Sequence, residues 1–152
     1  MATSTLTRPT WTTAGRETAG SAALALGALL LAGEAAVHIQ QYAAIFHAVS
    51  WVGPLFLANA AASIVTIGGL ASTRTRQLAA LAGIVISVVA LGGLVVSYGE
   101  GLFGWQEAGF RAPVAIAVIT EVGAVILLSA ALTVRTTRSP ARRTPATPAA
   151  RA

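Results

Sequence analysis

The sequence predicts an all-α integral membrane protein, a bundle of four transmembrane helices with both chain ends on the cytoplasmic side. Three observations lead to this fold class. The 152 residues are 55% hydrophobic and only 10% charged, whereas soluble domains keep about a quarter of their residues charged. Four apolar runs each approach the ~20 residues that a helix needs to cross a bilayer. Finally, the arginines fall almost entirely on one side of that arrangement.

The four apolar runs lie at about residues 18–39, 50–71, 77–98 and 112–134, within a transmembrane domain of residues 17–134. Four crossings return the chain to the side on which it started. Pro54 and Pro113 fall in the first turn of the second and fourth runs, where a missing N–H costs little, so they indicate helix starts. The short segment 72–77 predicts a tight turn between antiparallel helices.

The orientation follows from the arginines. The residues on the side of the chain ends are Arg8, Arg16, Arg74, Arg76, Arg135, Arg138, Arg142, Arg143 and Arg151, and only Arg111 lies on the other side. The positive-inside rule therefore predicts cytoplasmic termini in an inner or plasma membrane. Aromatic residues gather at the opposite interface, as expected of amphipathic rings at the headgroup layer; they are Tyr42, Trp51, Tyr98, Phe103, Trp105 and Phe110.

The beginning of the chain has a second interpretation. Arg8 and Arg16 followed by the apolar segment 21–32 resemble a signal peptide. The apolar character resumes after Glu34, and cleavage would leave three spans, so a retained first helix is favoured.

The two ends of the chain differ from the membrane domain. Residues 1–16 are rich in Thr and Ser, and residues 135–152 mix Thr, Pro, Ala and Arg without an apolar period. Neither segment has enough apolar surface to fold alone, so both are predicted to be disordered. The C-terminal arginines would anchor the topology and touch anionic lipid headgroups.

Small residues predict how the helices pack. Ala79, Gly83 and Ser87 recur at steps of four in the third run. Such residues let helix backbones approach closely in lipid, where little hydrophobic drive acts between helices. A compact bundle of antiparallel helices is expected.

Few polar residues fall within the predicted membrane domain. Glu34, Asn59 and Glu121 are placed at similar depth in the outer half of three different helices, where they can form an intramembrane polar cluster. A charged side chain in this zone is costly and is a functional-site hypothesis by default. Glu121 has three interpretations: a protonated group that joins helices by a hydrogen bond to Asn59 or a backbone carbonyl, a proton or cation site, or a contact with a partner subunit.

His38 and His47 are candidate ligands of a metal ion or haem. Glu34 lies four residues before His38 and so shares its helix face. Glu34, His38 and His47 together would give a shell of two nitrogens and one oxygen. The alternative is that both histidines are interfacial residues that touch water or headgroups.

The second outer loop, residues 99–111, combines glycines, aromatic residues and two acids. It is expected to form a surface-hugging or re-entrant lid whose aromatic side chains rest on the bundle. Glu100 and Glu107 would then approach His38 or His47. No strand precedes its glycines, so nucleotide binding is not expected.

Several function classes are excluded or disfavoured by composition. The chain has no Cys, which excludes disulfides, thiolate metal sites and cysteine nucleophiles. It has no Asp and no G-x-S-x-G motif, so enzymatic activity is not expected. The basic residues form no stripe interleaved with aromatics, so nucleic-acid binding is not expected either.

The segment 33–60, GEAAVHIQQYAAIFHAVSWVGPLFLANA, and the loop GLFGWQEAGFR resemble small four-helix integral membrane proteins of unknown function from GC-rich bacteria. The overall shape is similar to that of the DoxX-like family. The resemblance covers about residues 20–134; it implies four spans and carries over no functional residue.

Two functional hypotheses follow. The first is a non-enzymatic accessory or interaction subunit, which forms a homo-oligomer or joins a larger membrane protein through its small-residue faces. The second is an outward-facing site for a cation, metal, haem or proton, built from Glu34, His38, His47 and Glu121.

Overall fold

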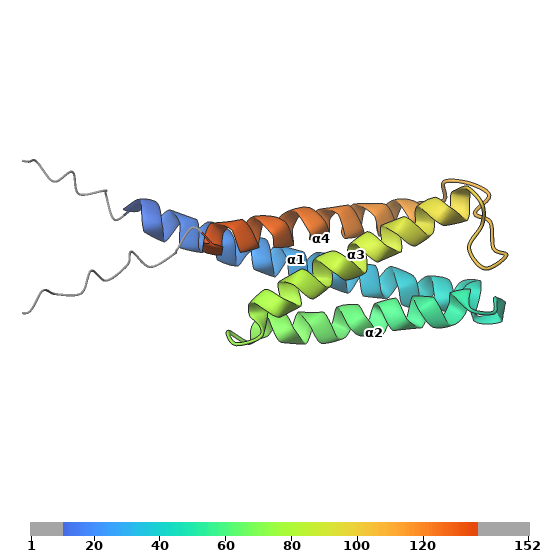
Figure 1. The fold of residues 1–152 in the computed structure, drawn as a ribbon, viewed down its shortest axis with the longest axis horizontal. Helices are drawn as coiled ribbons and strands as arrows, with labels where there is room; N and C mark the ends of the chain where they lie inside the picture. Colours follow the sequence, from blue (N-terminus) through green and yellow to red (C-terminus); the bar gives the residue numbers. More distant parts are fainter. Residues whose placement is uncertain (1–10, 137–152) are drawn as a thin grey trace, which may run out of the picture.

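Four long helices make up most of the described chain. The computed structural model describes residues 11–136. Its helices are α1 (Trp11–Ala44), α2 (Val52–Ala71), α3 (Arg76–Tyr98) and α4 (Ala112–Thr136), with a short 3-10 helix, η1 (Phe46–Ala48), after α1 (Figure 1). Apart from one isolated β-bridge between Leu102 and Trp105, no β-structure occurs in this part of the chain. The predicted all-α fold class is confirmed.

The bounds of three helices match the predicted spans within two residues at each end, and α1 differs. It begins at Trp11 and ends at Ala44, so residues 11–16 are helical and the prediction of disorder there is wrong. Residues 135 and 136, also predicted to be disordered, form the end of α4. The rest of the predicted tails, 1–10 and 137–152, lies outside the described residues. At ~1.5 Å per residue, the 34 residues of α1 exceed the ~30 Å of hydrocarbon, so the apolar run was shorter than the helix that contains it.

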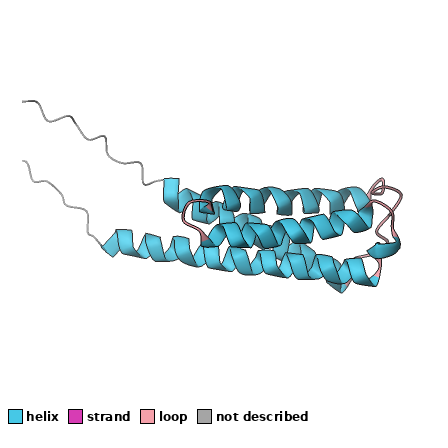
Figure 2. Cartoon of the chain, turned by 90° about the horizontal axis from the view of Figure 1, so that it is seen from below, coloured by secondary structure: helices cyan, strands magenta, loops and turns pink. Residues whose placement is uncertain are grey.

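Each helix packs against two others to form a closed bundle. α1 packs against α2 and α4, and α3 packs against the same two helices, so α1 lies diagonally from α3. Figure 2 shows the start of α1, the end of α4 and the α2–α3 turn at one end, here called the termini end, and η1 with loop 99–111 at the other, here called the far end. In Figure 1, α3 runs obliquely from beside α2 at their connecting turn toward α4 at the far end.

The termini half of the bundle is tightly packed. Leu31 and Leu128 are completely buried there, within a core that also contains Ala80 from α3. A Cβ added to Gly27 or Gly83 would lie 2.7 Å from a Leu128 methyl group. Both glycines are therefore needed to let α1 and α3 approach Leu128 of α4.

The α2–α3 turn is held by an arginine. Arg76 donates from Nε to the Leu70 carbonyl at 3.0 Å and from Nη2 to the Ala71 carbonyl at 3.4 Å. The Thr75 hydroxyl donates to the Gly69 carbonyl at 2.8 Å. These donors satisfy carbonyl groups at the end of α2 that have no partner within the helix.

Two connections that depend on glycine form the far end. In the first, α2 starts so close to η1 that a Cβ on Gly53 would clash with the Phe46 carbonyl oxygen, and only glycine fits. In the second, Gly101 and Gly104 have φ values of 88° and 83°, a region that glycine enters without steric cost. These turns fold loop 99–111 back toward the bundle.

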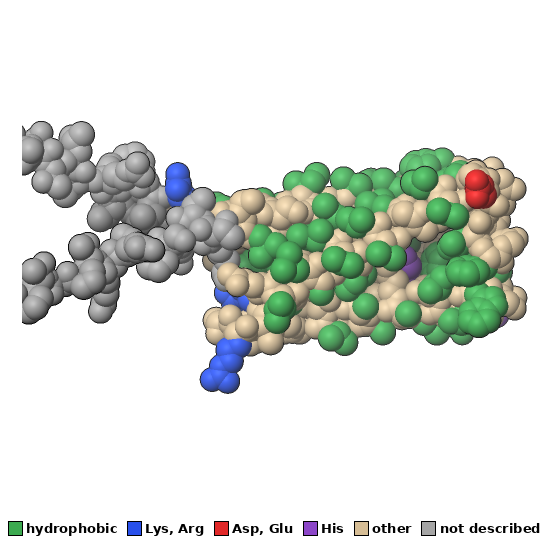
Figure 3. Space-filling view, viewed as in Figure 1, with side chains coloured by type: hydrophobic (Ala, Val, Ile, Leu, Met, Phe, Trp, Pro, Cys, Tyr) green, Lys and Arg blue, Asp and Glu red, His purple; other side chains and the backbone are tan. Residues whose placement is uncertain are grey.

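The outward faces of the helices are apolar. Val65, Leu78 and Ile119 are 75%, 71% and 67% exposed, and green apolar side chains cover much of the face in Figure 3. All four helices are long and apolar enough to cross a membrane, as in a multi-pass membrane protein. Trp51 and Phe110 are exposed in the connections at the far end, a place that suits rings at a headgroup layer.

Candidate functional site

A cavity of about 550 Å³ occupies the far half of the bundle. All four helices, η1 and loop 99–111 contribute to its lining, most of which is apolar. The polar lining side chains are His38, Gln41, Asn59, Ser97, Glu107, Arg111 and Glu121, with the indole of Trp105. Figure 3 shows that the surface is hollowed toward the far end, with a histidine visible inside the hollow.

Glu34 anchors the polar cluster from α1. Its side chain is fully buried, and the Ser87 hydroxyl of α3 donates to its Oε2 at 2.8 Å. Asn59 of α2 lies beside this carboxyl. The other oxygen, Oε1, is buried without a hydrogen-bond partner among the described residues. Glu34 thus connects diagonal helices just below the cavity, which it does not itself line.

His38 lies one helical turn beyond Glu34 and lines the cavity. Its Nδ1 is 2.9 Å from the Glu34 backbone carbonyl oxygen. A carbonyl oxygen only accepts, so Nδ1 carries the hydrogen and donates it. In a neutral imidazole the other nitrogen, Nε2, then presents a lone pair.

Glu121 of α4 faces that lone pair. Its Oε1 lies 3.8 Å from His38 Nε2, and the two side chains are 3% and 9% exposed. A lone pair and a carboxylate repel each other, so the two groups attract only when one more proton resides on the imidazole or the carboxyl. With that additional proton, the pair could donate to a group at the edge of the cavity. The second carboxyl oxygen, Oε2, is buried and has no partner among the described residues.

The structure brings together most of the predicted site residues. Glu34, His38 and Glu121 converge, and Asn59 joins them from α2. His47 does not: it is exposed at the far end, where its ring faces Tyr42 at 6.4 Å between centroids, and it does not line the cavity.

The metal prediction finds no support in this arrangement. Within residues 11–136, no group of three or more His, Asp or Glu side chains has a geometry that could hold a metal ion. The shell expected of Glu34, His38 and His47 is not assembled, because His47 follows α1 in η1 and its side chain is exposed. The haem alternative stays a prediction.

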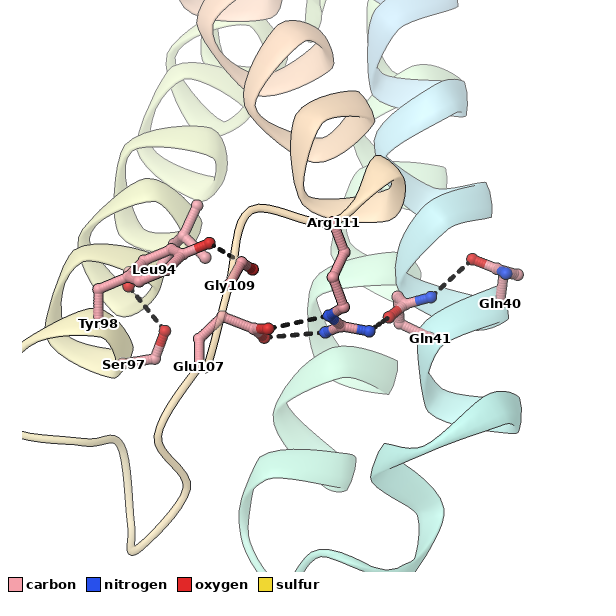
Figure 4. A network of polar contacts seen from close by, with 8 residues as sticks. All are labelled: Gln40, Gln41, Leu94, Ser97, Tyr98, Glu107, Gly109 and Arg111. Atoms are coloured by element: carbon pink, nitrogen blue, oxygen red, sulfur yellow. Dashed lines mark hydrogen bonds and ion pairs between the residues drawn. The ribbon is translucent and has the colours of Figure 1, made fainter.

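A second polar network closes the far end of the cavity (Figure 4). Arg111 donates from Nε and Nη2 to the two carboxylate oxygens of Glu107, both at 2.9 Å. Its Nη1 reaches Gln41 Oε1 of α1 at 3.4 Å. The Glu107 carboxylate raises the pKa of Arg111 above its usual range, so the guanidinium stays charged.

Loop 99–111 forms the lid that the sequence predicts, with different partners. Trp105 packs edge-on against Phe46 at 5.1 Å between ring centroids and lines the cavity. Phe103, in contrast, is 63% exposed. Glu107 pairs with Arg111 rather than with a histidine, and Glu100 is exposed.

Sequence reasoning missed three contributors to the site. Ser87 was assigned to close helix packing, and its contact with Glu34 depends on the position of α3 across the bundle. Gln41 carried a usable signal, because it lies three residues after His38 and so on the same helix face. The role of Phe46 as a wall of the cavity follows from η1, which no periodic pattern predicts.

Comparisons with protein-family models, curated proteins and solved structures return no match to this chain. The similarity to DoxX-like proteins therefore stays a prediction, and the function must be argued from the cavity and its polar end.

Proposed function

We propose that this membrane protein binds an amphipathic, lipid-soluble molecule within the bilayer. The polar group of the ligand lies beside His38 and Glu121, and its apolar part extends toward the lipid. The observation that carries the proposal is a cavity of about 550 Å³ with a mostly apolar lining and the buried His38–Glu121 pair at its edge. Small-molecule sites commonly have volumes of about 300–1,000 Å³ and this mixture of apolar walls with few polar groups.

The ligand reaches the cavity from the side of the bundle, between α2 and α3. Leu55 of α2 and Val85 and Val89 of α3 line the cavity and are also 46%, 60% and 67% exposed. They therefore form the rim of an opening on the lipid-facing surface. The far end is covered by Trp105 and by the Glu107–Arg111 pair, which supports a path through lipid over a path from water.

The polar end suits a hydroxyl or carbonyl group. When the His38–Glu121 pair carries its additional proton, it can donate that proton to an acceptor. Glu121 Oε2, which lacks a partner among the described residues, can accept from a donor. A buried polar atom without a partner costs about 1–3 kcal/mol, and a ligand oxygen placed here would recover part of that cost. The proton site predicted from sequence thus becomes the polar end of the ligand site, without His47.

The orientation and the accessory role are further proposals. The arginine distribution supports a cytoplasmic termini end and an outward far end. The chain has no Cys, so Ser72→Cys and Gly109→Cys give single thiols at opposite ends. In intact cells, a membrane-impermeant maleimide should label only Gly109→Cys.

Exposed Gly68 and Gly92 on α2 and α3 would admit a close partner helix, which supports the accessory role.

The proposal is tested by closing the cavity. Gly93 of α3 lines it, and a Cβ there would meet only a Leu102 methyl group at 3.8 Å. The side chain of Gly93→Leu would therefore start from an unobstructed Cβ and extend into the cavity. Gly92→Leu is the matched control, because a Cβ at Gly92 meets nothing within 4 Å and Gly92 is not a lining residue.

The wild type and both variants are purified in mild detergent, and bound compounds are extracted and identified by mass spectrometry. A lipid-soluble compound should be recovered in about stoichiometric amount from the wild type and Gly92→Leu. Gly93→Leu should lose about tenfold or more, as expected when ~1.4 kcal/mol or more of binding free energy is lost. Identical extracts from all three proteins would contradict the proposal. Ala90→Leu, also at a lining position, replaces Gly93→Leu if that variant misfolds.

A further inference from the structure

The cavity has one aromatic wall. The ring of His38 lies 4.9 Å from that of Phe56, Phe56 stacks on Phe46 at 4.3 Å, and Phe46 meets Trp105 at 5.1 Å, all between centroids. All four residues line the cavity. The rings therefore form a continuous series from the polar end to the lid, although they come from α1, α2, η1 and loop 99–111.

The α3 wall of the cavity contains two small residues. Ala90 and Gly93 lie three residues apart on one face of this helix, and both line the cavity. The space over Gly93 is open apart from a Leu102 methyl group. A flat group has room between this face and the aromatic side chains, which are tilted or edge-on to one another except where Phe46 and Phe56 stack.

The ionisable side chains that line the cavity occur in pairs, and the nearby Glu34 carboxyl accepts a hydrogen bond from Ser87. Among the described lining residues, His38 faces Glu121 at 3.8 Å and Arg111 binds Glu107 at 2.9 Å. An anionic or cationic ligand would find no free counter-charge and would have to break one of these pairs. A neutral ligand is favoured.

We propose that the ligand is a neutral molecule with a planar ring and a hydroxyl or carbonyl oxygen on that ring, an inference that rests on the proposed function. The ring lies between the aromatic series and the Ala90–Gly93 face. The ring oxygen meets the His38–Glu121 pair. Any aliphatic tail leaves between α2 and α3, where the rim is apolar and exposed. Offset or edge-on contacts with aromatic side chains make the ring favourable beyond its apolar area.

The test uses Trp105 as a reporter inside the cavity. The full chain carrying Trp11→Phe and Trp51→Phe has Trp105 as its single tryptophan and is placed in phosphatidylcholine nanodiscs. Three brominated quenchers serve as probes: 6-bromo-2-naphthol, a ring alcohol; 10-bromo-1-decanol, a chain alcohol; and 6-bromo-2-naphthoate, an anionic ring. Quenching of Trp105 emission is measured against the mole fraction of each probe in lipid.

The ring alcohol should quench saturably, at about fivefold or more lower mole fraction than the chain alcohol or the anionic ring. Phe56→Leu should remove most of this preference. Phe110→Leu is the control, because Phe110 is 71% exposed and does not line the cavity. Circular dichroism and gel filtration establish that each variant is folded before it is compared.

The outcomes separate the two proposals. Saturable binding of the chain alcohol or the anionic ring with equal or higher affinity overturns the neutral-ring inference and leaves lipid-side binding intact. An unchanged ring preference in Phe56→Leu overturns the assigned position of the ring. If no probe saturates and Gly93→Leu yields the same extract as Gly92→Leu, the proposed function itself fails.

Discussion

The two halves of this bundle use the same four helices in different ways. In the termini half, Leu128 of α4 fills the space over Gly27 and Gly83 and is completely buried. In the far half, a cavity of about 550 Å³ and a buried His38–Glu121 pair take the place of that packing. Small residues of α3 face a large side chain, Leu128, in one half and open space in the other. The size of the partner opposite α3 therefore distinguishes the packed half from the half that can bind.

This division has an energetic reason. Membrane helices associate largely through van der Waals contact, and a void removes such contacts from the groups around it. The packed termini half therefore supplies stability that allows the far half to keep an open space and three buried acids, Glu34, Glu107 and Glu121. Mutations of the same kind should have unequal effects in the two halves.

The largest difference is expected for truncation of leucine. Leu128→Ala removes a fully buried side chain and should lower the free energy of unfolding by about 3–4 kcal/mol. Leu94→Ala, at the edge of the existing cavity, should lower it by about 1 kcal/mol, because few contacts are lost. Unfolding in mixed detergent micelles measures both. Equal losses would mean that the far half is packed as tightly as the termini half.

The opposite change, from glycine to leucine, should again destabilise the protein more in the termini half than in the far half. Gly83→Leu places atoms where a Cβ alone is 2.7 Å from Leu128, and overpacking should cost about 2–3 kcal/mol. Gly93→Leu, on the same helix, enters open space and should change stability by less than about 1 kcal/mol. The same unfolding assay applies, and a severe loss in Gly93→Leu would show that the cavity collapses in the membrane.

Polar contacts should sharpen the comparison further. Ser87→Ala leaves both Glu34 carboxyl oxygens without a hydroxyl donor and should destabilise the protein by about 2 kcal/mol. Ser63→Ala is a control of identical chemistry, since Ser63 makes only a 3.4 Å contact with Asn59 and should lose about 0.5 kcal/mol. If the control loses as much as Ser87→Ala, the cavity-side acid cluster contributes nothing particular to stability.

The smallest effect is expected at the lid. Glu107→Gln removes the carboxylate that Arg111 contacts in bidentate fashion and should cost about 1 kcal/mol, because the Arg111 side chain is 36% exposed. Since the pKa of Arg111 is raised by this partner, alkaline pH within the usual range should not mimic the mutation. Hydrogen exchange of loop 99–111 should accelerate in Glu107→Gln and stay unchanged in the control Glu100→Gln.

Most of the fold could be predicted from the sequence because bilayer thickness fixes the length of an apolar run. That constraint located α2, α3 and α4 within two residues at each end. It failed for α1, because the ends of this helix extend beyond the apolar run and no Pro or Gly interrupts residues 34–44. Hydropathy predicts which residues contact lipid. Where a helix ends outside the lipid depends instead on residues such as Pro and Gly that interrupt helices.

The site could be predicted only in part. Glu34, His38 and Glu121 were found because ionisable residues at membrane depth are rare. His47 was grouped with them from its spacing in sequence, but the chain turns into η1 before His47 and the side chain is exposed. No feature of the sequence predicts the cavity. Ala90 and Gly93, which line it, are the same small residue types that allow close helix packing in the termini half.

Arg76 has a consequence for how this protein is made. By the positive-inside rule, its positive charge is expected to help retain the α2–α3 turn on one side of the membrane during insertion. After insertion, its guanidinium fastens the carbonyl groups at the end of α2. One side chain thus acts at both stages of assembly, first as a topology signal and then as a hydrogen-bond donor that holds the turn. Lysine at this position would keep the positive charge but make fewer hydrogen bonds to the end of α2. Arg76→Lys would therefore distinguish an effect on insertion from an effect on folding.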